Sequence, residues 1–280
     1  MRKSFVALFF VALGFSAFCQ GPFPTPEQVE AFKKSKTLVI LEKDVFSVYN
    51  PLIKAAVKQE WNITPYEIVP FDEFLKKKKD PAYSFLILTS TAFENDRTGA
   101  YYDYLNIILG DPVNNLSKMP EFCSFPLGYS KSEEFLYQSK LPVILKFMQK
   151  HVKSLLEHPN VSLKDLRYYN DNLRKLPQKV LWVAKEDLAP TVNTESKIKA
   201  LYDHPVKIVT RKELDKALEN PPEDMAFLFK IGPGETGKEG RIYKIILGVD
   251  GTMYYYNFHL LSAKRPDAML KSDFKRLGRY

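Results

Sequence analysis

The two halves of the chain carry the same order of predicted secondary-structure elements, and this internal repeat constrains the fold more than any other feature of the sequence. Each half contains five apolar runs of strand length, at 37–41, 66–69, 85–88, 104–109 and 122–127 and again at 180–183, 206–209, 227–229, 243–247 and 254–261. Helices are expected after the first, second and fifth strand of each half. The short runs Ile-Lys-Ala, Ile-Val and Ile-Ile-Leu also recur at nearly constant separation. We infer that one β-α-β-α-β-β-β-α plan occurs twice.

The predicted fold class is α/β, with one mixed sheet in each unit. The first strands of each unit are short apolar runs rather than strict alternations, which is typical of strands covered on both faces. Parallel strands need a crossover connection, and the intervening helices supply it. Turns join the later strands, and Asp250-Gly251 favours a tight hairpin because glycine accepts a positive φ. Each unit is therefore expected to combine a parallel core with an antiparallel hairpin, with helices on both faces of the sheet.

The repeat also sets the domain boundaries. The first unit is expected over 37–160 and the second over 179–280, with a linker over 161–178. Residues 20–36 are assigned to an N-terminal linker, because they begin with the proline-rich run GPFPTP, which is typical of an extended chain.

Residues 1–19 have the order of a secretory signal peptide. Arg2 and Lys3 precede an apolar run over 5–18, and small residues lie near Cys19. This run is shorter than the roughly 20 residues that a membrane-spanning helix needs, and no later segment reaches that length. Cleavage after Cys19 predicts a periplasmic or secreted protein. The alternative is a lipoprotein anchored through Cys19, which the bulky Phe18 disfavours.

Removal of Cys19 leaves Cys123 as the single cysteine of the mature chain. One cysteine makes no internal disulfide, and Cys123 lies in an apolar strand, so a buried thiol is expected. The formal net charge of the whole chain is +8, with the lysines spread along it. We interpret this charge as a solvated basic surface, and nucleic acid is not an expected partner.

One run of glycines matches two nucleotide-binding patterns. Residues 232–238, GPGETGK, fit both the G-x-G-x-x-G spacing and the G-x-x-x-x-G-K spacing. Both chemistries require the loop to open a helix, whose free N–H groups meet the phosphate. A strand-like run follows here instead, and Glu239 stands where a phosphate loop carries a hydroxyl. We interpret the run as a loop between strands and predict no cofactor.

The other chemistry-bearing residues form no catalytic or metal-binding pattern. His151 and His158 lie two helical turns apart, roughly 10 Å along the axis, which is too far for one metal ion, and both are expected to be solvated near a helix end. No nucleophile elbow of the Gly-x-Ser-x-Gly type occurs. No catalytic residue and no metal ligand is therefore predicted.

Four residues near the C-terminus are candidate contacts for a partner: Tyr255, His259, Lys271 and Lys275. Tyr255 and His259 alternate along the last strand and share one face of it. Lys271 and Lys275 belong to a basic stretch that also contains Lys264, Arg265, Arg276 and Arg279 and that suits an anionic partner. The alternative is that the final helix packs on this face of the strand, so that Tyr255 and His259 contact the helix rather than a partner.

The order of elements resembles the thioredoxin-like fold, which alternates strands and helices and ends in a hairpin and a helix. The active proteins of that fold carry Cys-x-x-Cys at the first helix, whereas 46–51 and 189–193 contain no cysteine here. The resemblance therefore implies no redox activity. The leader that ends in AFCQ, the high Lys and Tyr content and the run WNITPY at 61–66 also resemble uncharacterised exported proteins of the Bacteroidetes.

These observations favour an exported, non-catalytic binding or scaffolding protein of the bacterial periplasm or envelope. The groove between two duplicated units is a natural site for an envelope protein or a small ligand. The alternative is an envelope hydrolase or transferase whose catalytic residues come together only in three dimensions. Two carboxylates, or a histidine and a carboxylate, that converge in one pocket would distinguish it.

Overall fold

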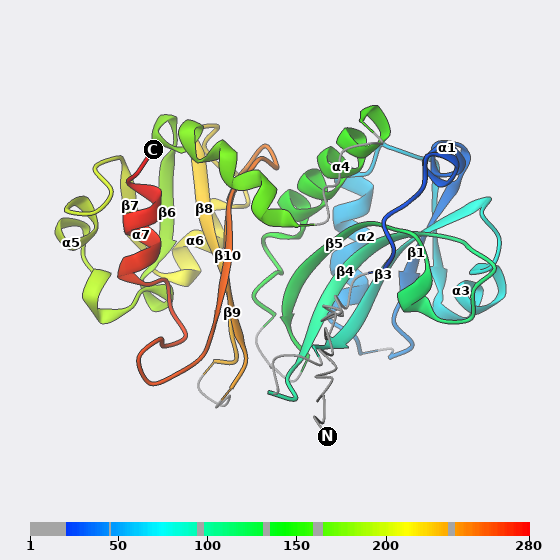
Figure 1. The fold of residues 1–280 in the computed structure, drawn as a ribbon, viewed down its shortest axis with the longest axis horizontal. Coiled ribbons are helices and arrows are strands. Elements are labelled where there is room, and N and C mark those ends of the chain that lie inside the picture. Colours follow the sequence, from blue (N-terminus) through cyan, green and yellow to red (C-terminus); the bar gives the residue numbers. More distant parts are fainter. Residues whose placement is uncertain (1–20, 45, 94–97, 131–134, 159–164, 235–238) are drawn as a thin grey trace, which may run out of the picture.

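The computed structural model describes residues 21–280 except 45, 94–97, 131–134, 159–164 and 235–238, so the predicted signal peptide lies outside the described residues. Two five-stranded sheets stand side by side (Figure 1). The first has the order β2-β1-β3-β4-β5, with β1 (Lys36–Leu41), β2 (Tyr66–Pro70), β3 (Tyr83–Ala92), β4 (Tyr101–Leu109) and β5 (Glu121–Tyr129). The second has the order β10-β9-β8-β6-β7, with β6 (Val180–Ala184), β7 (Val206–Val209), β8 (Met225–Ile231), β9 (Arg241–Gly248) and β10 (Met253–Leu260).

The two sheets share one topology, which confirms the predicted fold class. β1 pairs in parallel with β2 and β3, and β3, β4 and β5 follow as antiparallel neighbours. β6 pairs in parallel with β7 and β8, and β8, β9 and β10 are antiparallel in the same way. Two similar units of this kind are consistent with tandem duplication.

Helices cover each sheet on both faces. They are α1 (Pro26–Lys34), α2 (Tyr49–Glu60), α3 (Phe71–Lys77), α4 (Leu141–Glu157), α5 (Glu195–Lys199), α6 (Arg211–Ala217) and α7 (Lys271–Leu277), with 3-10 turns η1 (Leu116–Lys118), η2 (Leu166–Gln178), η3 (Lys185–Asp187) and η4 (Pro190–Val192). We call the face under α2 and α4, or under α5 and α7, the helix-pair face. The opposite face, under α3 or α6, is the single-helix face.

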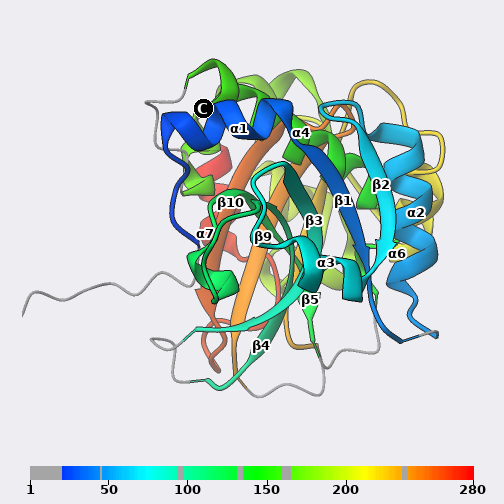
Figure 2. The same cartoon turned by 90° about the vertical axis from the view of Figure 1, so that its right-hand side faces the viewer.

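The segment assigned to an N-terminal linker contains the helix α1, which sequence analysis missed. Thr25 and Gln28 form a capping box at its start, with Pro26 in the first turn. Phe32 is fully buried and stacks on Phe122 of β5 with ring centroids 4.3 Å apart. Figure 2, which views the molecule from the first unit, shows α1 lying across the top of this unit.

The predicted linker over 161–178 also carries structure. Its 3-10 turns, η2, run along the free edge of β10. The side-chain amide of Asn170 donates to the carbonyl of Tyr256 at 3.1 Å and accepts from its N–H at 2.7 Å. This amide therefore satisfies backbone groups that an open sheet edge would leave unpaired.

The second sheet packs its single-helix face against the first unit. The ring of Phe229 on β8 stacks on Phe125 of β5, with centroids 6.4 Å apart and planes within 4°. The Tyr104 and Tyr243 hydroxyls are 2.8 Å apart. Buried residues of both units thus form one continuous cluster, which aromatic side chains dominate at this boundary. The two units contribute different surfaces, so the packing is not two-fold symmetric.

The tip of the β9–β10 hairpin tests this packing. Gly251 has φ +81, and a Cβ added there would lie 2.6 Å from Cβ of Lys146 and 2.7 Å from the backbone nitrogen of Phe147 on α4. Gly251→Ala is therefore expected to combine the strain of a positive φ with a clash, and to lower the free energy of unfolding by about 2–4 kcal/mol in urea titrations. Gly99→Ala is the control, because Gly99 also has a positive φ, +59, but has nothing within 4 Å. Equal losses in the two variants would contradict close docking of the hairpin on α4.

Candidate functional site

Two lysines lie side by side in the interior of the second unit. Lys230 of β8 and Lys244 of β9 are directly paired across the antiparallel ladder, and both point to the helix-pair face. Only 7% of Lys230 and 1% of Lys244 is exposed. Like charges opposite one another destabilise a sheet, and a buried ammonium group without a partner is costly. These lysines therefore require acidic partners.

The C-terminal stretch supplies those partners. Asp273 of α7 binds Lys244, with its two oxygens 2.8 and 2.9 Å from Nζ. Asp267, in the connection before α7, places Oδ1 2.7 Å from Nζ of Lys230. Asp273 also accepts hydrogen bonds from the Tyr255 hydroxyl at 2.9 Å and from the Leu270 backbone N–H at 2.9 Å. The ion pairs thus attach α7 and the preceding loop to the sheet.

Burial and charge act in opposite directions on this pair. Burial raises the pKa of Asp273, but the charge of Lys244 and the hydrogen bonds to the carboxylate outweigh it, so the pKa is lowered overall. Burial lowers the pKa of Lys244, and Asp273 opposes this shift. The pKa of Lys244 is thus lowered overall, and the short contacts between its Nζ and Asp273 are those of an ion pair.

A second charged group lies at the carboxyl ends of the parallel strands, where open α/β sheets hold their ligands. Asp187 follows β6, and its Oδ1 lies 3.0 Å from Nη2 of Arg211 at the start of α6 and 3.8 Å from Nζ of Lys230. Burial raises the pKa of Asp187, against the charges of Lys230 and Arg211. Asp187 thus has two cationic neighbours, whereas the exposed Glu186 beside it accepts the backbone N–H of Arg211 at 3.2 Å.

The described part of the glycine-rich run contacts the carboxylate of Asp267. The N–H of Gly234 donates to Asp267 Oδ2 at 2.9 Å, and a Cβ on Gly232 would lie 1.9 Å from Asp267 Oδ1. The close approach of Asp267 therefore requires glycine at 232. Residues 235–238 lie outside the described residues.

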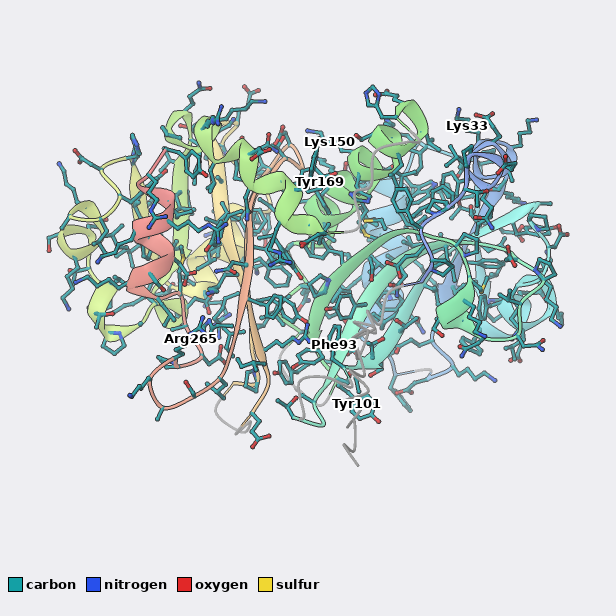
Figure 3. The ribbon with its side chains drawn as sticks, in the orientation of Figure 1. Lys33, Phe93, Tyr101, Lys150, Tyr169 and Arg265 are labelled. Atoms are coloured by element: carbon teal, nitrogen blue, oxygen red, sulfur yellow. The ribbon has the colours of Figure 1, made fainter. Side chains whose placement is uncertain are left out.

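The inward orientation of the acids leaves a cationic exterior, which we call the basic surface. Its six side chains are exposed and lie on α7, on the loop before it and just after it: Lys264, Arg265, Lys271, Lys275, Arg276 and Arg279. Among the residues that the structure describes, none of the six forms an ion pair with an acidic side chain. In Figure 1 α7, in red, lies over the second sheet, and Figure 3 marks Arg265 on the loop that precedes it. The arrangement suits an anionic partner.

The four predicted contact residues are divided between interior and surface. Lys271 and Lys275 are exposed and belong to the basic surface. Tyr255 and His259 are 0% and 2% exposed, because α7 and the loop before it cover them. His259 Nε2 lies 3.0 Å from the carbonyl oxygen of Pro266. The alternative interpretation, a strand covered by the final helix, therefore describes Tyr255 and His259, which support the basic surface from beneath.

The other predicted residues show one further correction. His151 was expected in solvent, but it is 4% exposed, with Nδ1 2.9 Å from the Tyr169 hydroxyl. His158 is exposed at the end of α4, and Cys123 is a buried free thiol.

Within the described residues, no group of three or more His, Cys, Asp or Glu side chains is placed to hold a metal ion. No helix in the described part of the chain is long and apolar enough to cross a membrane.

No family model matches the chain, and comparisons with curated proteins and with solved structures give no significant match either.

A double-mutant cycle tests the ion pair that holds α7. Asp273→Asn leaves a buried lysine without its counter-charge, so we expect the free energy of unfolding to fall by about 3–5 kcal/mol. The double variant Lys244→Met/Asp273→Asn is expected to be more stable than Asp273→Asn alone. Lys275→Met, on the exposed side of the same helix, is the control and should change stability by less than about 0.5 kcal/mol. Additive losses in the cycle would show that the two groups are not coupled.

The buried histidine predicts a pH dependence of stability. Burial lowers the pKa of His151 from 6.5 to about 4, against an opposing backbone hydrogen bond with Phe122. The folded protein thus binds fewer protons than the unfolded chain between these values, so stability is complete above about pH 6.5 and falls as the pH drops towards 4. The loss amounts to about 3 kcal/mol from this residue. Thermal unfolding from pH 7 to 4 should show a shallower decline for His151→Gln and an unchanged decline for the exposed His158→Gln.

Proposed function

We propose that this protein is an exported, non-catalytic binding or scaffolding protein of the bacterial periplasm or envelope, and that it docks an anionic partner on the basic surface. The observation that carries the proposal is the segregation of charge in the last residues of the chain. Asp267 and Asp273 face inward and neutralise Lys230 and Lys244. The six cations of the same stretch face solvent. The signal-like leader over 1–19 supports export.

The arrangement of the charged groups supports binding over catalysis. Asp187 and Asp267, near the carboxyl ends of β6 and β8, are committed to ion pairs with Arg211 and Lys230. At the boundary between the units, Lys140 binds Asp215 at 2.6 Å, and aromatic rings fill the adjoining space. A hydrolase or transferase needs an acid and a base that are free to exchange protons with a substrate.

Unpaired cations on a rigid, well-anchored helix steer and hold an acidic partner. The side chains of Lys271 and Lys275 lie one turn apart on α7, and the buried ion pair beneath them fixes that helix on the sheet. An acidic patch of an envelope protein is the partner that this surface fits best. Binding that depends on such contacts weakens as salt rises, because exposed charges are screened over about 10 Å at 0.1 M salt.

Charge reversal tests the proposed docking. The variant Lys271→Glu/Lys275→Glu is compared with the wild type and with Lys54→Glu/Lys58→Glu, which makes the same change at two exposed lysines with the same spacing on α2. Each protein is immobilised, envelope extract is applied, and bound proteins are eluted with rising salt and identified. We expect an acidic protein that the wild type and the α2 variant retain and that the α7 variant retains at least tenfold less.

Two outcomes would contradict the proposal. The α7 variant would retain the same proteins as the wild type, or the wild type would retain nothing that elutes with salt. Fractionation of the source cells tests export separately, since an intact N-terminus in the cytoplasm would contradict it.

A further inference from the structure

The single-helix face of the first sheet carries a pocket of about 80 Å³ with a polar floor and with apolar walls that include Phe93, Ile108 and Leu116. Its walls come from β3, β4, β5, the turn η1 and the segment that begins at Gly21. The floor is made of side chains that point to one face of the sheet, among them Thr89, Asn106, Ser124 and Glu121. The corresponding face of the second sheet carries Phe229, Tyr243 and Ile245, because it packs against the first unit. Polar groups are thus present in the first unit where the second has core.

Hydrogen bonds within the floor fix the orientation of its groups. The amide nitrogen of Asn106 donates to Thr89 Oγ1 at 2.8 Å, and its oxygen accepts from the Ser124 hydroxyl at 2.6 Å. The proton of Ser124 is therefore committed to Asn106, and its oxygen is left as an acceptor. Asn106 is 6% exposed, so this network is largely protected from water.

Of the lining residues that the structure describes, Glu121 is the one with a charged side chain. Its Oε2 accepts the N–H of Gly21 at 3.1 Å. A Cβ on Gly21 would lie 2.5 Å from the carbonyl oxygen of Met119, so glycine allows this close approach. A carboxylate beside a hydroxyl whose proton is already used makes this end of the pocket rich in acceptors. The complementary ligand is one that donates hydrogen bonds and carries positive charge.

We propose that this pocket binds a small primary amine that also bears a hydroxyl group, an amino alcohol, with its ammonium group on Glu121 and its hydroxyl on Ser124. The ammonium group brings three donors and no acceptor, which matches the acceptor-rich end. The pocket has room for two or three water molecules at about 30 Å³ each, and therefore for a ligand of a few non-hydrogen atoms. Among the described residues, the lining contains no Lys, Arg or His side chain that would attract an anionic ligand.

The protonation of Glu121 couples binding to pH. Burial raises the pKa of Glu121 to about 7, against the hydrogen bond from Gly21. The titratable group that its charge perturbs is the thiol of Cys123 on β5, whose pKa burial and then Glu121 raise. Lys118 on η1 is exposed outside the lining, and Asp111 accepts a hydrogen bond from Gln28. An ammonium ligand favours the ionised carboxylate, so binding below pH 7 releases a proton.

Three probes with four non-hydrogen atoms each separate the contributions of charge and hydroxyl: 2-aminoethanol, propylamine and ethylene glycol. Binding to the purified protein is measured by calorimetry at pH 8. We expect 2-aminoethanol to bind best, no more tightly than about 40 μM, the ceiling for four atoms. Its affinity should fall about tenfold from pH 8 to pH 6, as the ionised fraction of Glu121 falls. Propylamine should bind more weakly and ethylene glycol weakest.

The variant Glu121→Gln keeps the shape of the side chain and an acceptor for Gly21, and should bind 2-aminoethanol at least tenfold less tightly. It is also expected to be more stable than the wild type at pH 8, because it removes a buried charge, so a loss of binding is not a loss of folding. Glu157→Gln, at an exposed carboxylate on α4, should bind as the wild type does. Unchanged binding in Glu121→Gln, or ethylene glycol binding as tightly as 2-aminoethanol, would overturn the proposal. These results do not depend on the basic surface, which lies in the other unit.

Discussion

Two neighbouring lysines buried in the second sheet are the constraint on which the rest of that unit depends. Lys230 and Lys244 face the same side of adjacent strands, so their charges repel one another unless acids approach from above. Asp267 and Asp273 do so, and they bring with them the loop and the helix in which they lie. The two acids of the C-terminal stretch are thereby neutralised by buried lysines. The cations of the same stretch are left outside, and the basic surface follows from the burial of the lysines.

The same topology serves different purposes in the two units because their surroundings differ. In the second unit, the single-helix face is pressed against β5 and α4, and rings such as Phe229 fill it. In the first unit this face meets α3, the N-terminal segment and the loop around η1, and it reaches the second unit only through side chains at one end such as Tyr104, so among the described residues polar side chains such as Asn106 are tolerated there. The two units thus have the same topology but pack through different surfaces. Two-fold symmetric packing would have given both units this pocket or covered it in both, whereas here the first unit keeps an acceptor-rich pocket and the second does not.

The order of strands and helices was predictable because it depends on local patterns. Short apolar runs, the crossover requirement and Asp250-Gly251 lead to the observed topology without any knowledge of long-range contacts. Residue-level alignment of the halves was less reliable. The Ile-Ile-Leu match aligns Ile107 in the sequence of the first half with Ile245 in that of the second. In the structure Ile107 points to the helix-pair face of its unit, whereas Ile245 points to the single-helix face, against the neighbouring unit. Side chains on a strand alternate, so a match displaced by one residue aligns opposite faces.

The surface half of the candidate site was also visible in the sequence, whereas the buried half was not. Lys271 and Lys275 lie on the exposed side of a short amphipathic helix. Tyr255 and His259 were misplaced because α7 reaches back over β10, and nothing in the alternation of one strand reports what covers it. The partnership of Lys230 with Asp267 joins residues 37 positions apart, and no spacing rule links them. The basic character of this stretch was predictable, because its six cations outnumber Asp267 and Asp273 wherever those acids point. The inward orientation of the two acids was not predictable, since it depends on lysines buried in distant strands.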